Sequence, residues 1–198
     1  MQKELRVRKH PRLKNYDYSS NGAYFITFCV KDRHEMLGQI VGRGIPDAPS
    51  LSDIDAPCVE LTEYGKNVDE AIKFLNDKHQ NIQIEKYVIM PNHVHMIILI
   101  TNEDNSIGNS GEDRVIVKNS GASGKPRPTN AIIPKHISSI KRFTNKQAGF
   151  DMWQDSFHDR IIRNETEYQI RWQYINENPQ KWEEDDYYDS ERRIILCR

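Results

Sequence analysis

Two β-rich apolar runs joined by Pro91-Asn92 constrain the fold of this chain more than any other feature. They cover residues 82–90 (IQIEKYVIM) and 93–100 (HVHMIILI). In the second run both alternating faces are largely apolar, which is typical of a central strand that is covered on both sides. Because Pro91 cannot donate to a sheet ladder, it is expected at a turn or a bulge.

The other segments alternate between strand and helix patterns. We predict strands at 23–30 and 157–162, a helix at 62–77 and a short basic helix at 134–147. A last helix follows the N-cap pair Asn164 and Glu167 and ends before Pro179. The order β-α-β-β-α-β-α predicts an α+β fold with a ferredoxin-like antiparallel sheet.

Length and loops predict a single domain over residues 1–198. Two stretches, at about 42–57 and 101–130, are rich in Gly, Pro, Ser and Asn and are predicted to be flexible insertions. Neither side of the second insertion carries enough helices and strands to close a hydrophobic core alone.

No membrane segment or secretory signal is expected. The longest mainly apolar stretch, Val94 to Ile100, is far shorter than the roughly 20 residues that span a bilayer. The three cysteines, at 29, 58 and 197, are scattered and form no CxxC pair. This usage favours a reducing cytoplasm and argues against a zinc knuckle or a disulfide framework.

The charge pattern permits a nucleic-acid partner without requiring one. The net charge is −1, yet basic residues gather near the start, and segment 134–147 has no acidic residue. A protein that is neutral in sum can still present a basic face to phosphate, although a solvated charged surface fits equally well. The candidate DNA contacts are Arg8, Arg12, Lys141, Arg142 and Lys146.

His93 and His95 form a candidate metal-binding pair. Residues i and i+2 of a strand project from one face about 7 Å apart, so both rings can approach one cation. A chain with seven histidines contains about 0.25 such pairs by chance, so two satisfied strand histidines are the open alternative. A histidine-triad hydrolase is disfavoured because Ile97 occupies the third position, and a cupin because helices are predicted.

Tyr174 and Asn178 share a face of the last helix. Tyr168, Trp172 and Ile175 form its apolar stripe, and Tyr174 lies about 160° from Trp172 around the helix. Tyr174 and Asn178 could therefore approach one site, as a nucleophile and as a third metal ligand through the amide oxygen. Taken alone, Tyr174 also fits an amphipathic surface tyrosine.

This trio suits metal-assisted attack on a phosphodiester. A phenol with a pKa near 10 is only about one part in a thousand ionised at pH 7, so it needs help to attack phosphorus. A divalent cation that polarises the phosphate supplies that help, and attack leaves a 5′-phosphotyrosine and a free 3′-hydroxyl. Imidazole and amide-oxygen ligands favour Mg²⁺ or Mn²⁺ over a structural zinc.

Four motifs resemble one known family, the HUH tyrosine transposases, and in particular their REP-associated branch. EKYVIMPNHVHMIILI is similar to the strand-borne His-hydrophobe-His motif of that family. MWQDSFHDRIIRNETEYQIRWQYINENPQKW is similar to its tryptophan, strand and tyrosine helix, and LTEYGK and SSIKRF resemble further family segments. The resemblance runs from about Tyr24 to Trp182 in the family's order.

The resemblance implies a ferredoxin-like catalytic domain that recognises DNA hairpins and cleaves single-stranded DNA nearby. His93 and His95 match the metal-binding pair, Tyr174 matches the nucleophile, and Asn178 stands where a polar side chain completes the metal site in relatives. The long insertions leave DNA specificity open. Relatives of the insertion-sequence branch are homodimers, whereas REP-associated members can be monomeric, so the oligomeric state is open too.

The sequence therefore predicts a transposase that cleaves and rejoins single-stranded DNA with a tyrosine and a divalent metal. Two alternatives are a rolling-circle replication initiator and a domesticated hairpin-binding protein. The initiators usually add a helicase or origin-binding region, which this sequence does not show. A purely binding role is disfavoured because the nucleophile and both histidines are present.

Overall fold

The computed structural model describes residues 20–42, 57–79, 81–101 and 132–188. Both predicted insertions fall almost entirely on residues 43–56 and 102–131, outside the described residues. In the described part, no helix combines the length and apolar character that a membrane crossing requires. The elements in chain order are β1 (Gly22–Cys29), η1 (Lys31–Arg33), β2 (Gly38–Val41), β3 (Cys58–Leu61), α1 (Glu63–Lys78), β4 (Ile82–Ile89), β5 (His93–Ile100), α2 (Ile132–Ala148), β6 (His158–Ile162), α3 (Glu165–Glu177) and η3 (Trp182–Glu184).

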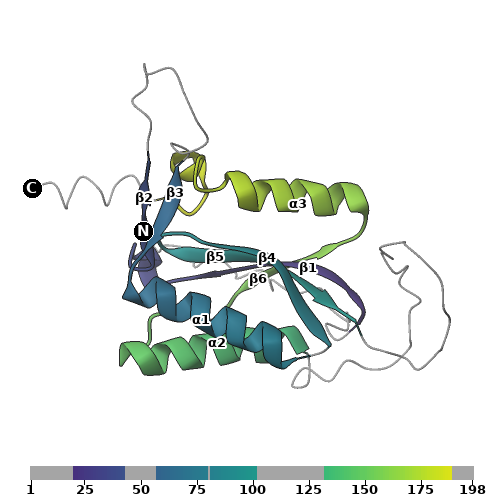
Figure 1. The fold of residues 1–198 in the computed structure, drawn as a ribbon, viewed down its shortest axis with the longest axis horizontal. Coiled ribbons are helices and arrows are strands. Elements are labelled where there is room, and N and C mark those ends of the chain that lie inside the picture. Colours follow the sequence, from purple (N-terminus) through teal and green to yellow (C-terminus); the bar gives the residue numbers. More distant parts are fainter. Residues whose placement is uncertain (1–19, 43–56, 80, 102–131, 189–198) are drawn as a thin grey trace, which may run out of the picture.

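Four strands form one antiparallel sheet in the order β4-β5-β1-β6 (Figure 1). α1 connects β1 to β4, and α2 connects β5 to β6, so each helix joins two strands that are separated by one antiparallel neighbour. This is the ferredoxin-like arrangement. It confirms the predicted α+β class and the β-α-β-β-α-β-α order of the sheet strands and the three long helices.

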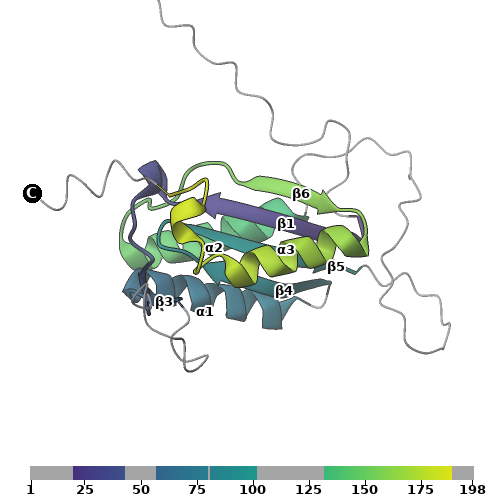
Figure 2. The same cartoon turned by 90° about the horizontal axis from the view of Figure 1, so that it is seen from above.

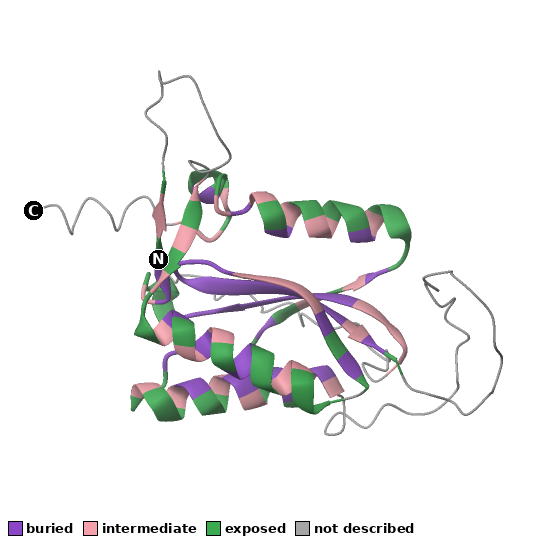
Figure 3. Cartoon of the chain, viewed as in Figure 1, coloured by how far each residue is buried: buried purple, intermediate pink, exposed green. Residues whose placement is uncertain are grey.

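The three long helices cover opposite faces of the sheet. α1 and α2 lie side by side on one face, and α3 lies on the other (Figures 1 and 2). The larger core lies between the sheet and α1 and α2, and a smaller cluster lies under α3. Figure 3 shows buried residues on the sheet and along the helix surfaces that face it.

β5 is the covered central strand that its sequence predicts. It pairs with β1 on one side and β4 on the other. Val94, Met96 and Ile98 belong to the larger core, whereas Ile97 belongs to the cluster under α3. Because side chains alternate along a strand, His93 and His95 share the α3 face with Ile97.

A second, two-stranded sheet of β2 and β3 was not predicted from the sequence. β3 leads directly into α1, whose N-cap Thr62 accepts a hydrogen bond from the Gly65 amide. A Cβ atom at position 65 would lie 2.0 Å from the Leu37 carbonyl oxygen. Gly65 therefore permits a close approach between α1 and the chain before β2, which explains a glycine in the first turn of a helix.

The ends of α3 follow the predicted capping pattern. The Asn164 side chain accepts a hydrogen bond from the Glu167 amide at 2.8 Å, and the Glu167 carboxylate accepts one from the Arg163 amide at 3.1 Å. The helix ends at Glu177, two residues before Pro179. These local signals fix the start and the end of the helix that carries Tyr174.

Candidate active site

The two histidines of β5 lie side by side beneath residues 182–188. His93 Nε2 and His95 Nε2 are 2.9 Å apart, and the two residues are 0% and 1% exposed. In the strand register His95 is paired with Thr27 and His93 with Cys29, both on β1. The sheet therefore brings both rings to one point on its α3 face.

Hydrogen bonds to the other ring nitrogens fix how the two imidazoles point. Asn92 donates its amide hydrogens to the Arg33 and Tyr187 carbonyl oxygens, so its own oxygen faces His93 Nδ1 at 2.8 Å. Thr27 Oγ1 lies 2.7 Å from His95 Nδ1. Histidines that bind metals typically use one ring nitrogen in this way, which leaves the other nitrogen for the ion.

Burial favours the neutral form of both rings. Removal from water lowers the pKa of His95 and lowers that of His93 well below its ordinary value, and the neighbouring His95 lowers the pKa of His93 further. A neutral His93 that donates from Nδ1 keeps a lone pair on Nε2. This is the state that a metal ligand requires.

Tyr174 reaches the pair from α3. Its hydroxyl oxygen lies 3.4 Å from His95 Nε2 and donates to Asp185 Oδ2 at 2.9 Å. The Phe25 ring supports this arrangement from β1, with its centroid 5.2 Å from that of His95 and 5.9 Å from that of Tyr174. Burial and then the Asp185 carboxylate raise the pKa of the Tyr174 phenol above its usual value.

Asp185 is the residue that the sequence reasoning missed. It follows η3 and lies in a run of four consecutive acidic residues, 183–186. Its side chain is 1% exposed, and its ligand atom lies within 4.8 Å of those of His93 and His95. The usable signal is local, because the buried Trp182 and the half-buried Tyr187 flank this acid within a few residues.

Hydrogen bonds keep Asp185 ionised despite its burial. Burial alone raises the pKa of this carboxyl, but the contacts with His95, His93, the Tyr187 amide and the Asn178 side chain together hold it well below its usual range. The Tyr187 amide and Asn178 Nδ2 each donate to the carboxylate at 2.7 Å. A carboxylate beside two neutral imidazoles makes a nitrogen and oxygen donor set that fits a divalent cation.

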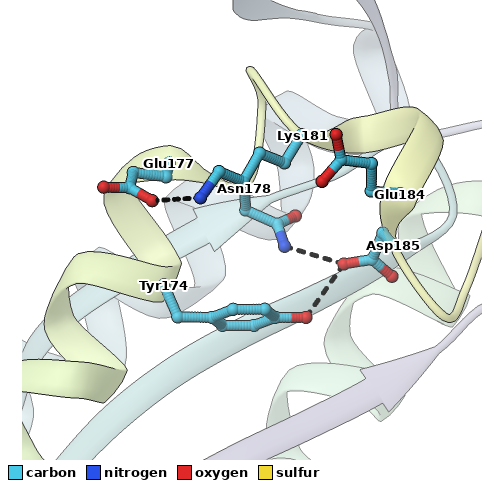
Figure 4. Close-up of a pocket in the computed structure, with 6 residues that line it drawn as sticks. All are labelled: Tyr174, Glu177, Asn178, Lys181, Glu184 and Asp185. Atoms are coloured by element: carbon cyan, nitrogen blue, oxygen red, sulfur yellow. Dashed lines mark hydrogen bonds and ion pairs between the residues drawn. The ribbon is translucent and has the colours of Figure 1, made fainter.

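Asn178 lies beside this group, at the C-cap of α3. Its Nδ2 donates to Asp185, while its Oδ1 is buried and has no hydrogen-bond partner in the described part of the chain. Figure 4 shows Tyr174 and Asn178 both directed toward Asp185 across a pocket of about 190 Å³. Its predicted role as third ligand stays a prediction, and Asp185 is the second candidate for that position.

Segment 182–188 covers the histidine pair. The His93 ring centroid lies 5.9 Å from that of Trp182 and 4.6 Å from that of Tyr187. Arg33 holds this segment through a 2.9 Å hydrogen bond from Nη1 to the Asp186 carbonyl oxygen. The pair is thus closed from solvent on this side, while Tyr174 and Asp185 line the adjoining pocket.

α2, which carries three of the predicted DNA contacts, lies on the opposite face of the sheet from α3, which carries Tyr174 (Figure 1). Lys141 donates to the backbone oxygens of Gln154 at 2.6 Å and Ser156 at 2.9 Å, and burial lowers its pKa to about 8. Arg142 and Lys146 are exposed. The remaining two candidates, Arg8 and Arg12, lie outside the described residues.

Comparisons with known proteins agree with the fold. No protein-family model matches the chain. The chain is 28% identical to an uncharacterized protein of Haemophilus influenzae over 182 residues. The matched region covers 91% of this chain and 93% of that protein. It is also similar to the solved structure of a REP-associated tyrosine transposase bound to a REP hairpin, with a TM-score of 0.53 and 17% identity over 89% of this chain and 74% of that one. That similarity shows a shared fold, as the sequence resemblance implied.

Proposed function

We propose that this protein is a metal-dependent transposase that cleaves and rejoins single-stranded DNA through Tyr174. One observation carries the proposal: the Tyr174 hydroxyl oxygen lies 3.4 Å from His95 Nε2 and 2.9 Å from Asp185 Oδ2. A phenol, two neutral imidazoles and a carboxylate from three separate elements thus share one buried point. The fold shared with a REP-associated tyrosine transposase supports the same conclusion.

In the proposed reaction the Tyr174 oxygen attacks the phosphorus of the scissile phosphodiester. A P–O bond to the phenol forms, the P–O3′ bond breaks, and the phenol proton is released to water, while the Asp185 carboxylate that accepts the phenol's hydrogen bond orients its oxygen. The departing 3′ oxygen takes a proton from water. A 3′-hydroxyl that later attacks the phosphotyrosine reverses these changes and rejoins a strand without ATP.

His93, His95 and either Asp185 or Asn178 would hold Mg²⁺ or Mn²⁺. When bound, the cation supplies positive charge beside the scissile phosphate and the leaving oxygen. That charge also opposes the effect of Asp185, which raises the pKa of the phenol. The protein's own contribution is to fix both ring orientations through Asn92 and Thr27 and to hold Tyr174 at their side.

We infer that the substrate is a DNA hairpin with single-stranded flanks, bound by a single catalytic domain in the cytoplasm. The support is that a REP-associated tyrosine transposase with a similar fold was solved bound to a REP hairpin. Exposed Arg142 and Lys146 could contact phosphates of such a substrate.

A covalent-capture assay tests the proposal. The probe is a 3′-labelled single-stranded library with hairpins and randomised flanks, incubated with Mn²⁺ and resolved under denaturing conditions. The wild type is expected to form a labelled adduct, because the 3′ part of the DNA stays on the tyrosine. Tyr174→Phe is expected to bind the library and form no adduct, whereas Tyr168→Phe on the same helix is expected to form it. An adduct with Tyr174→Phe, or none with the wild type, would contradict the proposal.

A further inference from the structure

We propose that Arg171 is a second functional residue of this site and positions the scissile phosphate for attack by Tyr174. The inference rests on the proposed function, because it assigns a ligand for the phosphate oxygens of that same reaction. It adds a cationic contact that neither the histidine pair nor the predicted DNA-binding residues provide.

The position of Arg171 follows from its place on α3. It precedes Tyr174 by three residues, so the two side chains are neighbours on the helix surface. The guanidinium carbon lies over the Phe25 ring, 5.1 Å from its centroid. The same ring stacks on His95 at 5.2 Å and meets the edge of Tyr174 at 5.9 Å. One aromatic ring therefore contacts the guanidinium, an imidazole of the metal pair and the phenol.

Arg171 forms no ion pair in the part of the chain that the structure describes, and its charge helps to lower the pKa of Glu167. The nearby carboxylate one turn earlier, Glu167, binds Arg160 Nε at 2.7 Å and accepts from the Arg163 amide at 3.1 Å. Arg171 Nε is buried and has no hydrogen-bond partner. Arg171 as a whole is only half-buried, so a ligand can reach its guanidinium. A buried donor atom without a partner is unfavourable in a folded protein, so its place beside a nucleophile points to a ligand that arrives from outside.

A phosphodiester fits this guanidinium by shape and by charge. Arginine presents a planar fork of donors that matches two phosphate oxygens, and it stacks on aromatic faces as it does on Phe25. In the proposed step Arg171 donates hydrogen bonds to the two non-bridging oxygens and transfers no proton. It would hold the phosphorus next to the Tyr174 oxygen and stabilise the charge that grows on those oxygens during attack. If Arg171 only packed on Phe25, the reaction would not depend on hydrogen bonds from its guanidinium to the phosphate.

The experiment combines a protein change with a matching DNA change. The substrate is an oligonucleotide selected from the library above, made with the normal scissile phosphate or with a neutral methylphosphonate at that position. We compare the wild type, Arg171→Met, Arg171→Lys and, as a matched control, Arg163→Met, because Arg163 is exposed just before the same helix. The measurements are adduct rate, DNA affinity, Mn²⁺ affinity and melting temperature.

The inference predicts that Arg171→Met slows adduct formation on the order of 100-fold while DNA and Mn²⁺ affinities stay unchanged. The methylphosphonate should slow the wild type strongly and slow Arg171→Met much less, because the contact is already missing. Arg171→Lys keeps the charge and most of the side chain, so its adduct rate should lie between those of the wild type and Arg171→Met. Arg163→Met should behave as the wild type does.

If the methylphosphonate slows adduct formation by the same factor in the wild type and in Arg171→Met, the two changes act independently. That result would show that Arg171 does not contact this phosphate. The same conclusion would follow if Arg171→Met lowered the melting temperature and kept the wild-type adduct rate. A wild type that forms no adduct on any substrate would remove the proposed function, and this inference with it.

Discussion

Tyr174 donates its hydroxyl to Asp185 at 2.9 Å, although α3 ends between the two residues. The chain turns at Pro179 and returns over the sheet, so an acid eleven residues after the phenol meets it beside the histidine pair. Three separate elements, β5, α3 and the segment after η3, therefore supply the candidate nucleophile and the candidate ligands. Because these residues lie on separate elements, single substitutions can measure what each one contributes to metal binding and to cleavage.

The third metal ligand can be identified by Mn²⁺ titration calorimetry. We expect Asp185→Asn to weaken Mn²⁺ binding by more than about tenfold, since it removes a charged oxygen donor beside two neutral imidazoles. Asn178→Ala is expected to weaken binding less, through loss of its hydrogen bond to Asp185. His93→Ala gives the reference for a lost ligand.

Asp186→Asn, which changes an exposed neighbouring acid, should leave Mn²⁺ affinity unchanged. A larger loss in Asn178→Ala than in Asp185→Asn would instead identify the buried Asn178 oxygen as the ligand.

The basic residues of α2 are expected to divide into two kinds. Changing exposed Arg142 and Lys146 to Gln should weaken DNA binding and flatten its salt dependence by about 0.7 to 0.9 in log–log slope for each lost phosphate contact. Lys141→Met should mainly lower the melting temperature, because two backbone carbonyls lose their donor. Anisotropy titrations over a range of salt concentrations, with thermal melts, check both. A Lys141→Met protein with normal stability and weak DNA binding would contradict this division.

Sequence reasoning succeeded where a signal is local. The alternation in β5 predicts a covered central strand, and the Asn164 cap and Pro179 delimit α3, because these patterns depend on neighbouring residues. Helical periodicity alone could not assign α2 to one face of the sheet, so the α2 cations were not known to lie opposite Tyr174. The ferredoxin-like connections of the sheet decide that question.

Asp185 could not be found in this way because its role depends on the return of the chain after Pro179. In the sequence it is one of four consecutive acidic residues, and the other three are exposed. The flanking Trp182 and Tyr187 indicate that this run packs against the protein, but only contacts with Tyr174, Asn178 and the histidines distinguish Asp185 from the other three acids. The pairing of β2 with β3 was also not predicted, because the two strands are short and lie apart in the sequence.

Gly65 is expected to be required for stability rather than for chemistry. Alanine usually favours a helix over glycine by about 1 kcal/mol, yet here its Cβ would lie 2.0 Å from the Leu37 backbone oxygen. We expect Gly65→Ala to lower the free energy of unfolding by about 1–3 kcal/mol, the usual range for overpacking. Urea unfolding measures this, with Glu70→Ala at an exposed position of α1 as the control. An unchanged or higher stability of Gly65→Ala would show that α1 can shift away from Leu37.

His136 is expected to make the protein less stable in mild acid. Burial lowers its pKa, the nearby His79 ring lowers it further, and the hydrogen bond to the Ile132 carbonyl only partly opposes this. The unfolded chain therefore binds a proton more readily than the folded one. The stability that the neutral ring contributes is fully present above its ordinary value of about 6.5 and is lost as pH falls from there through the folded pKa. One such histidine changes the free energy of unfolding by at most about 1.4 kcal/mol per pH unit.

Urea unfolding at pH 7 and at lower pH measures how much the free energy of unfolding falls between the two conditions. We expect a smaller fall for His136→Gln than for the wild type. The loss should not vanish, because burial also lowers the pKa of His93 and of His95. His158→Gln, at an exposed position of β6, is the matched control and should follow the wild type. If His136→Gln loses as much stability as the wild type between the same two pH values, the acid sensitivity comes from the histidine pair of β5 alone.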